Sequence, residues 1–466
     1  MIGKISPFTR NVGVLALMSV LAAGCSTMPP DAGFGSVSGL AKSRLGMDAK
    51  LVRSGADGSA LDQTVAEKLA KELTADDAVQ IALLNNRSLQ ATYWSVGIAQ
   101  ADLVQAGRLQ NPSFSFKRTH AGADVGIERT LTFSLVSLLT APLAKRIEAR
   151  RFEAIKLTVA NQMLALAVQT RRAHIEAVAA FQGMDYARQV SRSAEASAEL
   201  SGRMAAVGNS SQLDLAREQA FYAEAIGAVG RAARTALASR EKLTRLMGLW
   251  GKNTAFTLPS RLPELPVSPV VAEDVEAIAM RDRLDIQAAK IEAAQTASSL
   301  GLTRTTRFVN VLDLGYVRNS ATDLPGARGY EITLELPLFD WGTARVARAE
   351  ATYMQSLNRV AQTAIDARSE ARESYLAYRN AYDLAKHYRD TVIPLRKKIS
   401  EETLLRYNGM LVSTFELLAD SREQAAAVNS TIDALKDFWL AQADMEGALG
   451  GRLAGTPSKL EKGPTQ

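Results

Sequence analysis

The sequence is poor in the residues on which enzyme chemistry usually depends. Its 466 residues include one cysteine and three histidines, and only 6% are aromatic. His120, His174 and His387 lie far apart, and none has a second ligand at helical or hairpin spacing, so they predict no metal site. The sequence also has no glycine-rich phosphate loop and no nucleophile elbow. We therefore expect neither an enzyme nor a bound cofactor.

Long hydrophobic runs are also scarce. Mean hydropathy is close to zero and charged residues make up 22% of the chain, which excludes a protein built of many membrane-spanning helices. The formal charge is only +6, and lysines and arginines alternate with acids, as at residues 145–151. This alternation favours solvated helix faces over a nucleic-acid surface.

The clearest local signal lies at the amino terminus. Lys4 and Arg10 precede an uncharged run, Val12 to Leu21, which has the length of a signal-peptide core and is too short to span a bilayer permanently. Cys25 follows in a sequence that resembles the lipobox of bacterial lipoproteins. We predict a signal peptide at 1–24 and acylation of Cys25, and Ser26 is compatible with outer-membrane delivery. The alternative is an ordinary signal peptide beside a chance cysteine.

A first copy of a repeated pattern follows a lead-in at 25–72, which is rich in Gly, Ser, Ala and Asp and is expected to be loosely ordered. At Thr74 the sequence suits the N-cap of a helix. Beyond Pro112 apolar and polar residues alternate, as in half-buried strands. From about Ala144 a helical period lasts for roughly 60 residues, a rod of about 90 Å. The first copy, 73–258, should contain a helix to about Gly107, strands near 114–116 and 127–135 around a loop at 121–126, a long helix to a reversal at 208–211, and a helix at 212–249.

A second copy, at 272–450, has the same order of elements. It follows a linker, 259–271, that holds four prolines and cannot be helical. A tail at 451–466 is expected to be flexible. The expected elements are a helix at 272–303, alternating runs at 308–317 and 330–336 around a turn-rich stretch at 319–329, a long helix at 343–407 interrupted near Pro394, a reversal near Gly409, and a helix to 449.

Four strands are too few for a membrane barrel, which needs about eight or more. If the strands face lipid, their open edges must pair with other copies, because each unsatisfied backbone group costs several kcal/mol in hydrocarbon. The pattern therefore predicts an oligomer of unspecified number. Its helices would pack through small side chains such as Ala173, Ala177 and Ala180.

Short motifs occur along both copies. They are Asn-Arg-Ser-Leu-Gln-Ala at 86–91, Asn111-Pro112, Arg-Leu-Asp-Ile at 283–286 before Ala288-Ala289, the turns at 208–215 and 409–418, and Pro-Leu-Phe-Asp-Trp-Gly at 337–342. In this order they resemble the TolC-like outer-membrane efflux channel family over nearly the whole mature chain. The first copy departs from the family pattern, with Thr140-Ala141-Pro142 where a second Pro-Leu-Phe-type exit is usual.

The resemblance implies a mainly α fold with four β-strands: a trimeric twelve-stranded outer-membrane barrel continuous with a long periplasmic α-helical barrel. It further implies a passive duct of a tripartite efflux system, anchored through Cys25, with a periplasmic adaptor (membrane fusion) protein and an inner-membrane pump as partners. The sequence at 408–411 and 415–418 resembles that of a branch of the family linked to heavy-metal or copper export. The alternative is a periplasmic coiled-coil lipoprotein acting as adaptor or spacer, whose strands would lie in small soluble domains.

By the same resemblance, acidic residues near the turns form a cation-attracting gate. The matching positions are Asp214, Glu416 and Asp420. A ring of like charges would concentrate cations at the tunnel mouth. The alternative is that these acids cap or solvate the helices that begin there. The spacing from Gly409 to Glu416 is one residue longer than that from Gly208 to Asp214, and the sequence does not fix the geometry of the second turn.

Overall fold

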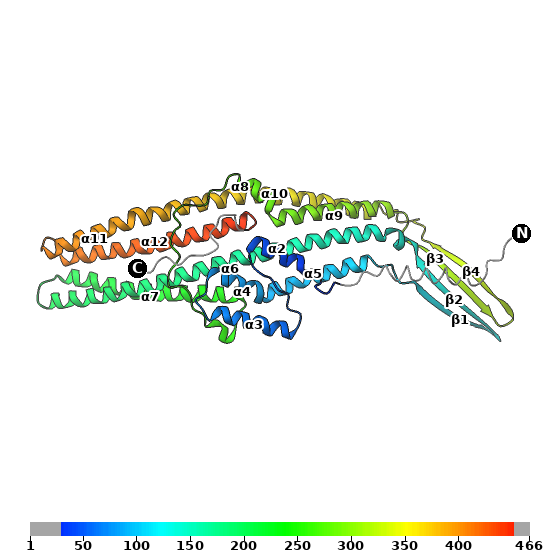
Figure 1. Ribbon diagram of the computed structural model, residues 1–466, viewed down its shortest axis with the longest axis horizontal. Coiled ribbons are helices and arrows are strands. Elements are labelled where there is room, and N and C mark those ends of the chain that lie inside the picture. Colours follow the sequence, from blue (N-terminus) through cyan, green and yellow to red (C-terminus); the bar gives the residue numbers. More distant parts are fainter. Residues whose placement is uncertain (1–28, 452–466) are drawn as a thin grey trace. The chain divides into compact units, whose positions relative to one another are not determined.

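The computed structural model describes residues 29–451, which form parts of two compact units (Figure 1). Unit 1 contains the described residues up to Ser36 together with Tyr93–Val159 and Asp285–Thr363. Unit 2 contains Val37–Thr92, Ala160–Leu284 and the described residues from Ala364. Each unit therefore takes segments from both halves of the sequence. The predicted signal peptide, Cys25 and almost all of the predicted tail lie outside the described residues.

The elements have the same order in the two halves, and the predicted class, mainly α with four strands, is confirmed. The first half contains α2 (Phe34–Leu45), α3 (Gly55–Leu69), α4 (Ala75–Asn85), α5 (Arg87–Ala106), β1 (Ser113–Ala121), β2 (Asp124–Ser134), α6 (Leu135–Ala206) and α7 (Gln212–Met247). The second half contains a 3-10 turn (Gly251–Thr254), α8 (Val275–Asp282), α9 (Leu284–Thr306), β3 (Leu312–Ala321), β4 (Leu324–Leu334), α10 (Thr343–His387), a π turn (Tyr388–Val392), α11 (Ile393–Asn408) and α12 (Thr414–Ala448).

The expectation of a loosely ordered lead-in is wrong, because α2 and α3 occupy most of it. Ser54 and Asp57 form a capping box at the start of α3, in which each side chain accepts a hydrogen bond from the other residue's backbone N–H. Leu61 and Val65 of α3 are buried against a core that includes Ala173 of α6. Burial of one face stabilises a helix whose composition alone would not.

The hairpins have shorter turns than the sequence suggested. Ala121 pairs with Asp124, and Ala321 pairs with Leu324, so each turn has only two unpaired residues. Gly122 in the first turn has φ +67°, a conformation that glycine adopts without steric cost. Most of the glycine-containing and polar stretches that were expected to be loops belong to the strands.

The two strand exits differ, as the departure from the motif suggested. After β2 the chain enters α6 at Leu135, nine residues before the expected start near Ala144, and Pro142 lies inside the helix. After β4 an irregular segment at 335–342 precedes α10. The predicted interruption near Pro394 is confirmed, since the π turn ends there and Pro394 occupies the first turn of α11.

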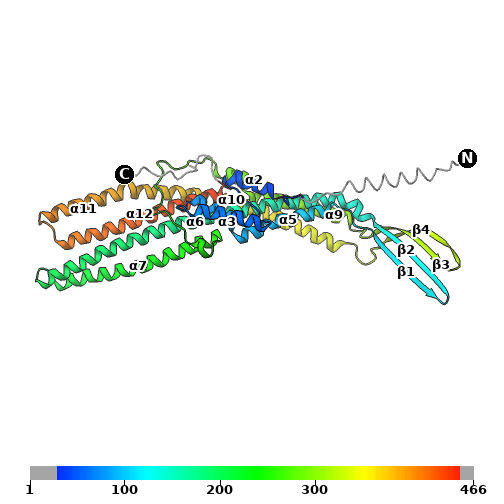
Figure 2. The same cartoon turned by 60° about the horizontal axis from the view of Figure 1, so that its bottom comes forward.

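Two helical hairpins lie side by side in unit 2, one made by the later part of α6 with α7 and the other by α11 with α12 (Figures 1 and 2). The second hairpin is continuous with an aromatic core in which Phe438 is fully buried. The Phe438 ring lies 5.5 Å from that of Tyr378 and 5.8 Å from that of Tyr382, centroid to centroid. Burial of such a side chain contributes about 1.5–3 kcal/mol, so this core fixes the base of the hairpin.

Candidate functional site

The four strands form one antiparallel sheet in the order β1-β2-β3-β4. The central pair, β2 and β3, joins the two halves of the chain, and Thr130 lies opposite Val317. β1 and β4 are the outer strands, so each has one edge that no strand of the described chain pairs. The two hairpins are thus one sheet of unit 1 and not two separate modules.

The two faces of this sheet differ in chemistry. Successive residues of a strand point to opposite faces, and directly paired residues point to the same face. One face, here called the apolar face, carries exposed hydrophobic side chains; they are Phe114, Phe116, Phe133, Leu314, Tyr316, Tyr330, Ile332 and Leu334. The opposite, polar face carries mainly small polar and charged side chains; they include Ser115, Lys117, Glu128, Thr130, Thr132, Asn319, Glu331 and Thr333.

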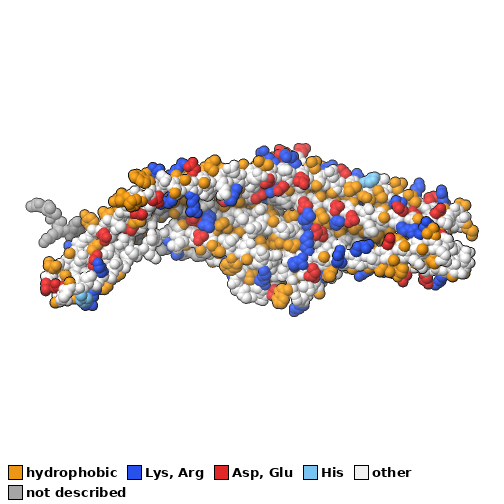
Figure 3. Space-filling view, turned by 180° about the vertical axis from the view of Figure 1, so that it is seen from behind, with side chains coloured by type: hydrophobic (Ala, Val, Ile, Leu, Met, Phe, Trp, Pro, Cys, Tyr) orange, Lys and Arg blue, Asp and Glu red, His pale blue; other side chains and the backbone are white. Residues whose placement is uncertain are grey.

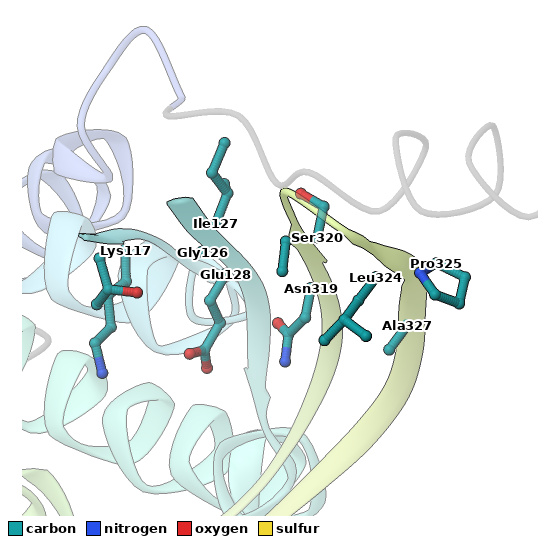
Figure 4. Close-up of a pocket in the computed structure, with 11 residues that line it drawn as sticks. Lys117, Gly126, Ile127, Glu128, Asn319, Ser320, Leu324, Pro325 and Ala327 are labelled. Carbon is teal, nitrogen blue, oxygen red and sulfur yellow. The ribbon is translucent and has the colours of Figure 1, made fainter. Parts of the chain in front are cut away.

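A hollow of about 270 Å³ lies near the hairpin ends. Lys117, Glu128 and Asn319, which pair across three strands, point to the same side of the sheet there, whereas Ile127 points to the opposite side (Figure 4). This view agrees with the division into two faces. In a single chain both faces are open to solvent, and Tyr330 on the apolar face is 80% exposed. A soluble protein rarely leaves so much contiguous apolar surface uncovered.

A second apolar region lies where the strands of unit 1 join its helices (Figure 3). In the segment after β4, Leu338 is 69% exposed, Phe339 98% and Trp341 60%. The Trp341 ring meets that of Phe308 edge-on, at 6.4 Å between centroids. Aromatic side chains of this kind are enriched where membrane proteins cross the lipid interface.

The two helical turns of unit 2 have the same construction, although the spacing to Gly409 differs by one residue. Gly208 has φ +79° at the first turn, and at the second the left-handed residue is Met410, with φ +59°, and not Gly409. Counted from these residues, Asp214 and Glu416 both follow after six positions. The additional residue between Gly409 and Glu416 arises because the left-handed residue of the second turn is Met410.

Asp214 and Glu416 both lie in the first turn of a helix. The hydroxyl of Ser211 accepts a hydrogen bond from the Asp214 N–H, and that of Ser413 accepts one from the Glu416 N–H. Asp214 also pairs with Arg217 at 3.4 Å. The caps of α7 and α12 are therefore Ser211 and Ser413, and the side chain of Asp214 is partly exposed and that of Glu416 exposed at the turns.

Asp420 lies one turn deeper, and the structure adds an acid that the sequence analysis missed. Glu218 follows Asp214 by four residues, and Asp420 follows Glu416 by four. Each has one carboxylate oxygen that is buried without a hydrogen-bond partner in the described chain. The other oxygen of Glu218 accepts a hydrogen bond from Arg422 at 3.0 Å, which joins α7 to α12. Buried carboxylate oxygens normally have donors, so these two positions call for a role beyond packing. The equal spacing in the two copies was the available sequence signal.

The histidines do not converge. His174 is buried, and its Nε2 lies 2.7 Å from the carbonyl oxygen of Leu73. Burial lowers the pKa of His174 below its ordinary value. Between residues 29 and 451, no group of three or more His, Cys, Asp and Glu side chains is arranged to hold a metal ion. Over the same residues, no helix has both the length and the apolar character needed to cross a membrane.

Comparison with known proteins identifies the fold. Neither protein-family models nor curated proteins match the chain. Among solved structures, CusC, which forms a transmembrane channel, is 18% identical with a TM-score of 0.66 and covers 81% of this chain and 92% of its own. The outer-membrane channel OprN is 16% identical with a TM-score of 0.68 and covers 88% and 94%. The Campylobacter jejuni outer-membrane channel CmeC is 17% identical with a TM-score of 0.65 and covers 87% and 89%. The chain therefore has the predicted TolC-like fold of outer-membrane channels.

Proposed function

We propose that the protein is the outer-membrane channel component of a tripartite efflux system, a passive duct through which small molecules or metal ions leave the cell. The observation that carries this proposal is the two-faced sheet with two open edges. An apolar face suits lipid, a polar face suits a water-filled lumen, and this alternation is the pattern of transmembrane barrel strands.

The number of strands is compatible with a homotrimer. Four strands cannot close, whereas three copies would supply a barrel of about twelve strands, within the known range. Pairing of β1 of one copy with β4 of the next would satisfy the backbone groups that the single chain leaves open.

The proposed partners and anchor follow from the same fold. A passive duct of this kind would need a periplasmic adaptor and an inner-membrane pump as partners. Cys25, once acylated, would anchor the mature amino terminus in the outer membrane, since each buried methylene contributes about 0.8 kcal/mol. Heavy-metal or copper cargo is proposed on the resemblance of residues 408–411 and 415–418.

For the gate we propose Asp214, Glu416 and Asp420, with Glu218 as a fourth acid. In a trimer each position would recur around the axis and concentrate cations at the mouth. The Glu218–Arg422 pair, which links the two helical hairpins, would hold the hairpins together in one state of the gate. Loss of such a link would favour a wider opening.

Adjacent residues of β4 provide a sharp test of the channel. Ile332 is 62% exposed on the apolar face, and Thr333 is exposed on the polar face. If the apolar face meets lipid, Ile332→Lys places a charge in hydrocarbon in every copy, at a cost that rises to about 2–4 kcal/mol at the bilayer centre, and the membrane-inserted oligomer should be lost. Thr333→Lys, its matched control, should insert, run as a heat-sensitive oligomer on gels, and conduct ions in planar bilayers. Equal insertion of both variants would contradict the proposed orientation of the sheet.

A further inference from the structure

Charge is divided between the two faces of the sheet in an unexpected way. All four acidic residues of the strands, Asp124, Glu128, Asp313 and Glu331, lie on the polar face. Four of the arginines, in contrast, lie on the apolar face; they are Arg118, Arg129, Arg318 and Arg328. Arginine on a lipid-facing surface is costly near the bilayer centre and costs little only near the interfaces.

Three of these arginines form a single line across the sheet, here called the arginine row. Arg129 of β2 pairs with Arg318 of β3, and Arg318 pairs with Arg328 of β4. Arg118 of β1 lies in the next line, opposite Ile127 and nearer the hairpin turns. Side chains directly opposite one another have Cβ atoms about 4.5–5.5 Å apart, and like charges at that distance destabilise a sheet.

Nothing in the described chain neutralises the row. None of the four arginines forms an ion pair with a carboxylate among residues 29–451. The guanidinium of Arg129 lies 5.9 Å from the centre of the Phe116 ring. Arg318 and Arg328 are exposed. Three adjacent cations without counter-charges indicate that an anion from outside the chain completes this surface.

The depth of the row indicates where that anion comes from. The neighbouring line on the same face, two residues along each strand, consists of Phe114, Leu131, Tyr316 and Tyr330, and two strand residues span about 6.6 Å. Tyrosines in barrel proteins mark the level at which hydrocarbon gives way to headgroups. The arginine row lies just beyond the tyrosines on the hairpin side, at the level of headgroups.

We propose that the arginine row binds the phosphate groups of phosphorylated lipids in the outer leaflet. This inference rests on the proposed function, because it requires the apolar face to meet lipid. Guanidinium forks pair with phosphate oxygens in two parallel hydrogen bonds, a geometry that lysine does not offer. The row would thereby fix the height of the barrel in the membrane and remove the repulsion between its own strands.

The test uses full-length oligomer in a neutral detergent, titrated with diphosphoryl lipid A, with the same lipid lacking its phosphates, or with inorganic phosphate. Binding is followed by native mass spectrometry and by thermal stability. Wild-type protein should bind and be stabilised by the diphosphoryl lipid only. The R129Q/R318Q/R328Q variant should bind it at least about tenfold more weakly, and the corresponding triple lysine variant should fall between.

A matched control removes three exposed arginines from helix surfaces, R188Q/R192Q/R231Q, and should bind the lipid as wild type does. If the triple glutamine variant does not assemble, Arg318→Gln alone tests the centre of the row. Equal binding by row and control variants, or full competition by inorganic phosphate, would overturn the inference. Conductance of the R129Q/R318Q/R328Q variant is also measured in a bilayer without phosphorylated glycolipid, to separate lipid binding from the channel function. If this variant conducts ions but has lost its preference for the phosphorylated lipid, the proposed function is unaffected. Wild-type protein that never inserts would overturn both.

Discussion

A Cβ atom at Gly248 would lie 2.8 Å from the carbonyl oxygen of Asn85, the last residue of α4 before the helix is interrupted and α5 begins. The second half repeats this relationship, because a Cβ at Gly450 would lie 2.9 Å from the carbonyl oxygen of Asp282, between α8 and α9. Both glycines have positive φ, +67° and +82°. The Asn85 amide also donates a hydrogen bond to the Gly248 carbonyl at 2.8 Å. The ends of α7 and α12 are thus fixed against helix breaks at equivalent positions.

Gly248→Ala should therefore destabilise unit 2 by more than about 2 kcal/mol, because the left-handed conformation costs about 1–2 kcal/mol and the close backbone atoms cannot move aside. Gly230→Ala within α7 is the matched control. A Cβ there would meet no atom within 4 Å, and alanine is about 0.5–1 kcal/mol better than glycine inside a helix. Thermal unfolding of the purified oligomer compares them, and similar melting temperatures would contradict the close approach.

The left-handed Met410 predicts a second change in stability. Both turns close with a hydrogen bond from the following amide to the carbonyl five residues earlier, at 2.9 Å after Gly208 and 2.8 Å after Met410. Met410 is 93% exposed, so its side chain gains little to offset the unfavourable backbone. Met410→Gly should stabilise the α11–α12 turn by about 0.5–1 kcal/mol, and Gly208→Met should weaken the α6–α7 turn by about 1–2 kcal/mol. Amide hydrogen exchange around each turn should slow in the first variant and quicken in the second; opposite changes would contradict the equivalence.

His174 predicts a pH dependence of stability. Its pKa is lowered from 6.5, chiefly by burial and also by Arg171, while the Leu73 carbonyl and Asp76 oppose the shift. Below pH 6.5 the unfolded chain binds a proton at His174 that the folded chain does not. The contribution of neutral His174 to stability is therefore full above pH 6.5 and is lost as the pH falls toward the pKa of the folded state. His174→Gln should reduce the drop in melting temperature between about pH 7.5 and about pH 5.5. His387→Gln is the control, and an equal drop in both variants would exclude His174 as the source.

The sequence predicts best where local chemistry decides the structure. The start of α7 follows from Ser211 and the helical period, and the break before α11 follows from Pro394. Asp214 and Glu416 were placed beside the two turns by the family resemblance, and the structure has them in the first turns of α7 and α12. The signals at Ser211 and Pro394 act over one helical turn and need no knowledge of the rest of the chain.

Features that depend on distant segments were not predictable in the same way. The pairing of β2 with β3 brings Arg129 opposite Arg318, and no local pattern in either strand indicates it. The α3 helix depends on burial of Leu61 and Val65 against α6 and α7. Both faces of the sheet are uncovered in one chain, so residues near the hairpin turns need not alternate between apolar and polar. The hydrogen-bonded pairing therefore extends beyond the alternating stretch, into residues that were expected to form loops.

The gate proposal makes a final prediction about ion selectivity. Asp214 and Glu416 keep accessible carboxylates at the two turns, and a trimer would place three copies of each around the axis. Removing these charges while keeping side-chain shape, with Asp214→Asn and Glu416→Gln together, should lower the cation-to-anion permeability ratio by about twofold or more, because the local cation concentration falls with the potential. Reversal potentials in planar bilayers measure this ratio. The difference should shrink in about 1 M salt, where the screening length is about 3 Å. Glu373→Gln with Asp383→Asn, exposed acids of α10, removes equal charge away from the turns and should leave the ratio unchanged. If both pairs lower it alike, the effect belongs to net charge and the acids at the turns are caps alone.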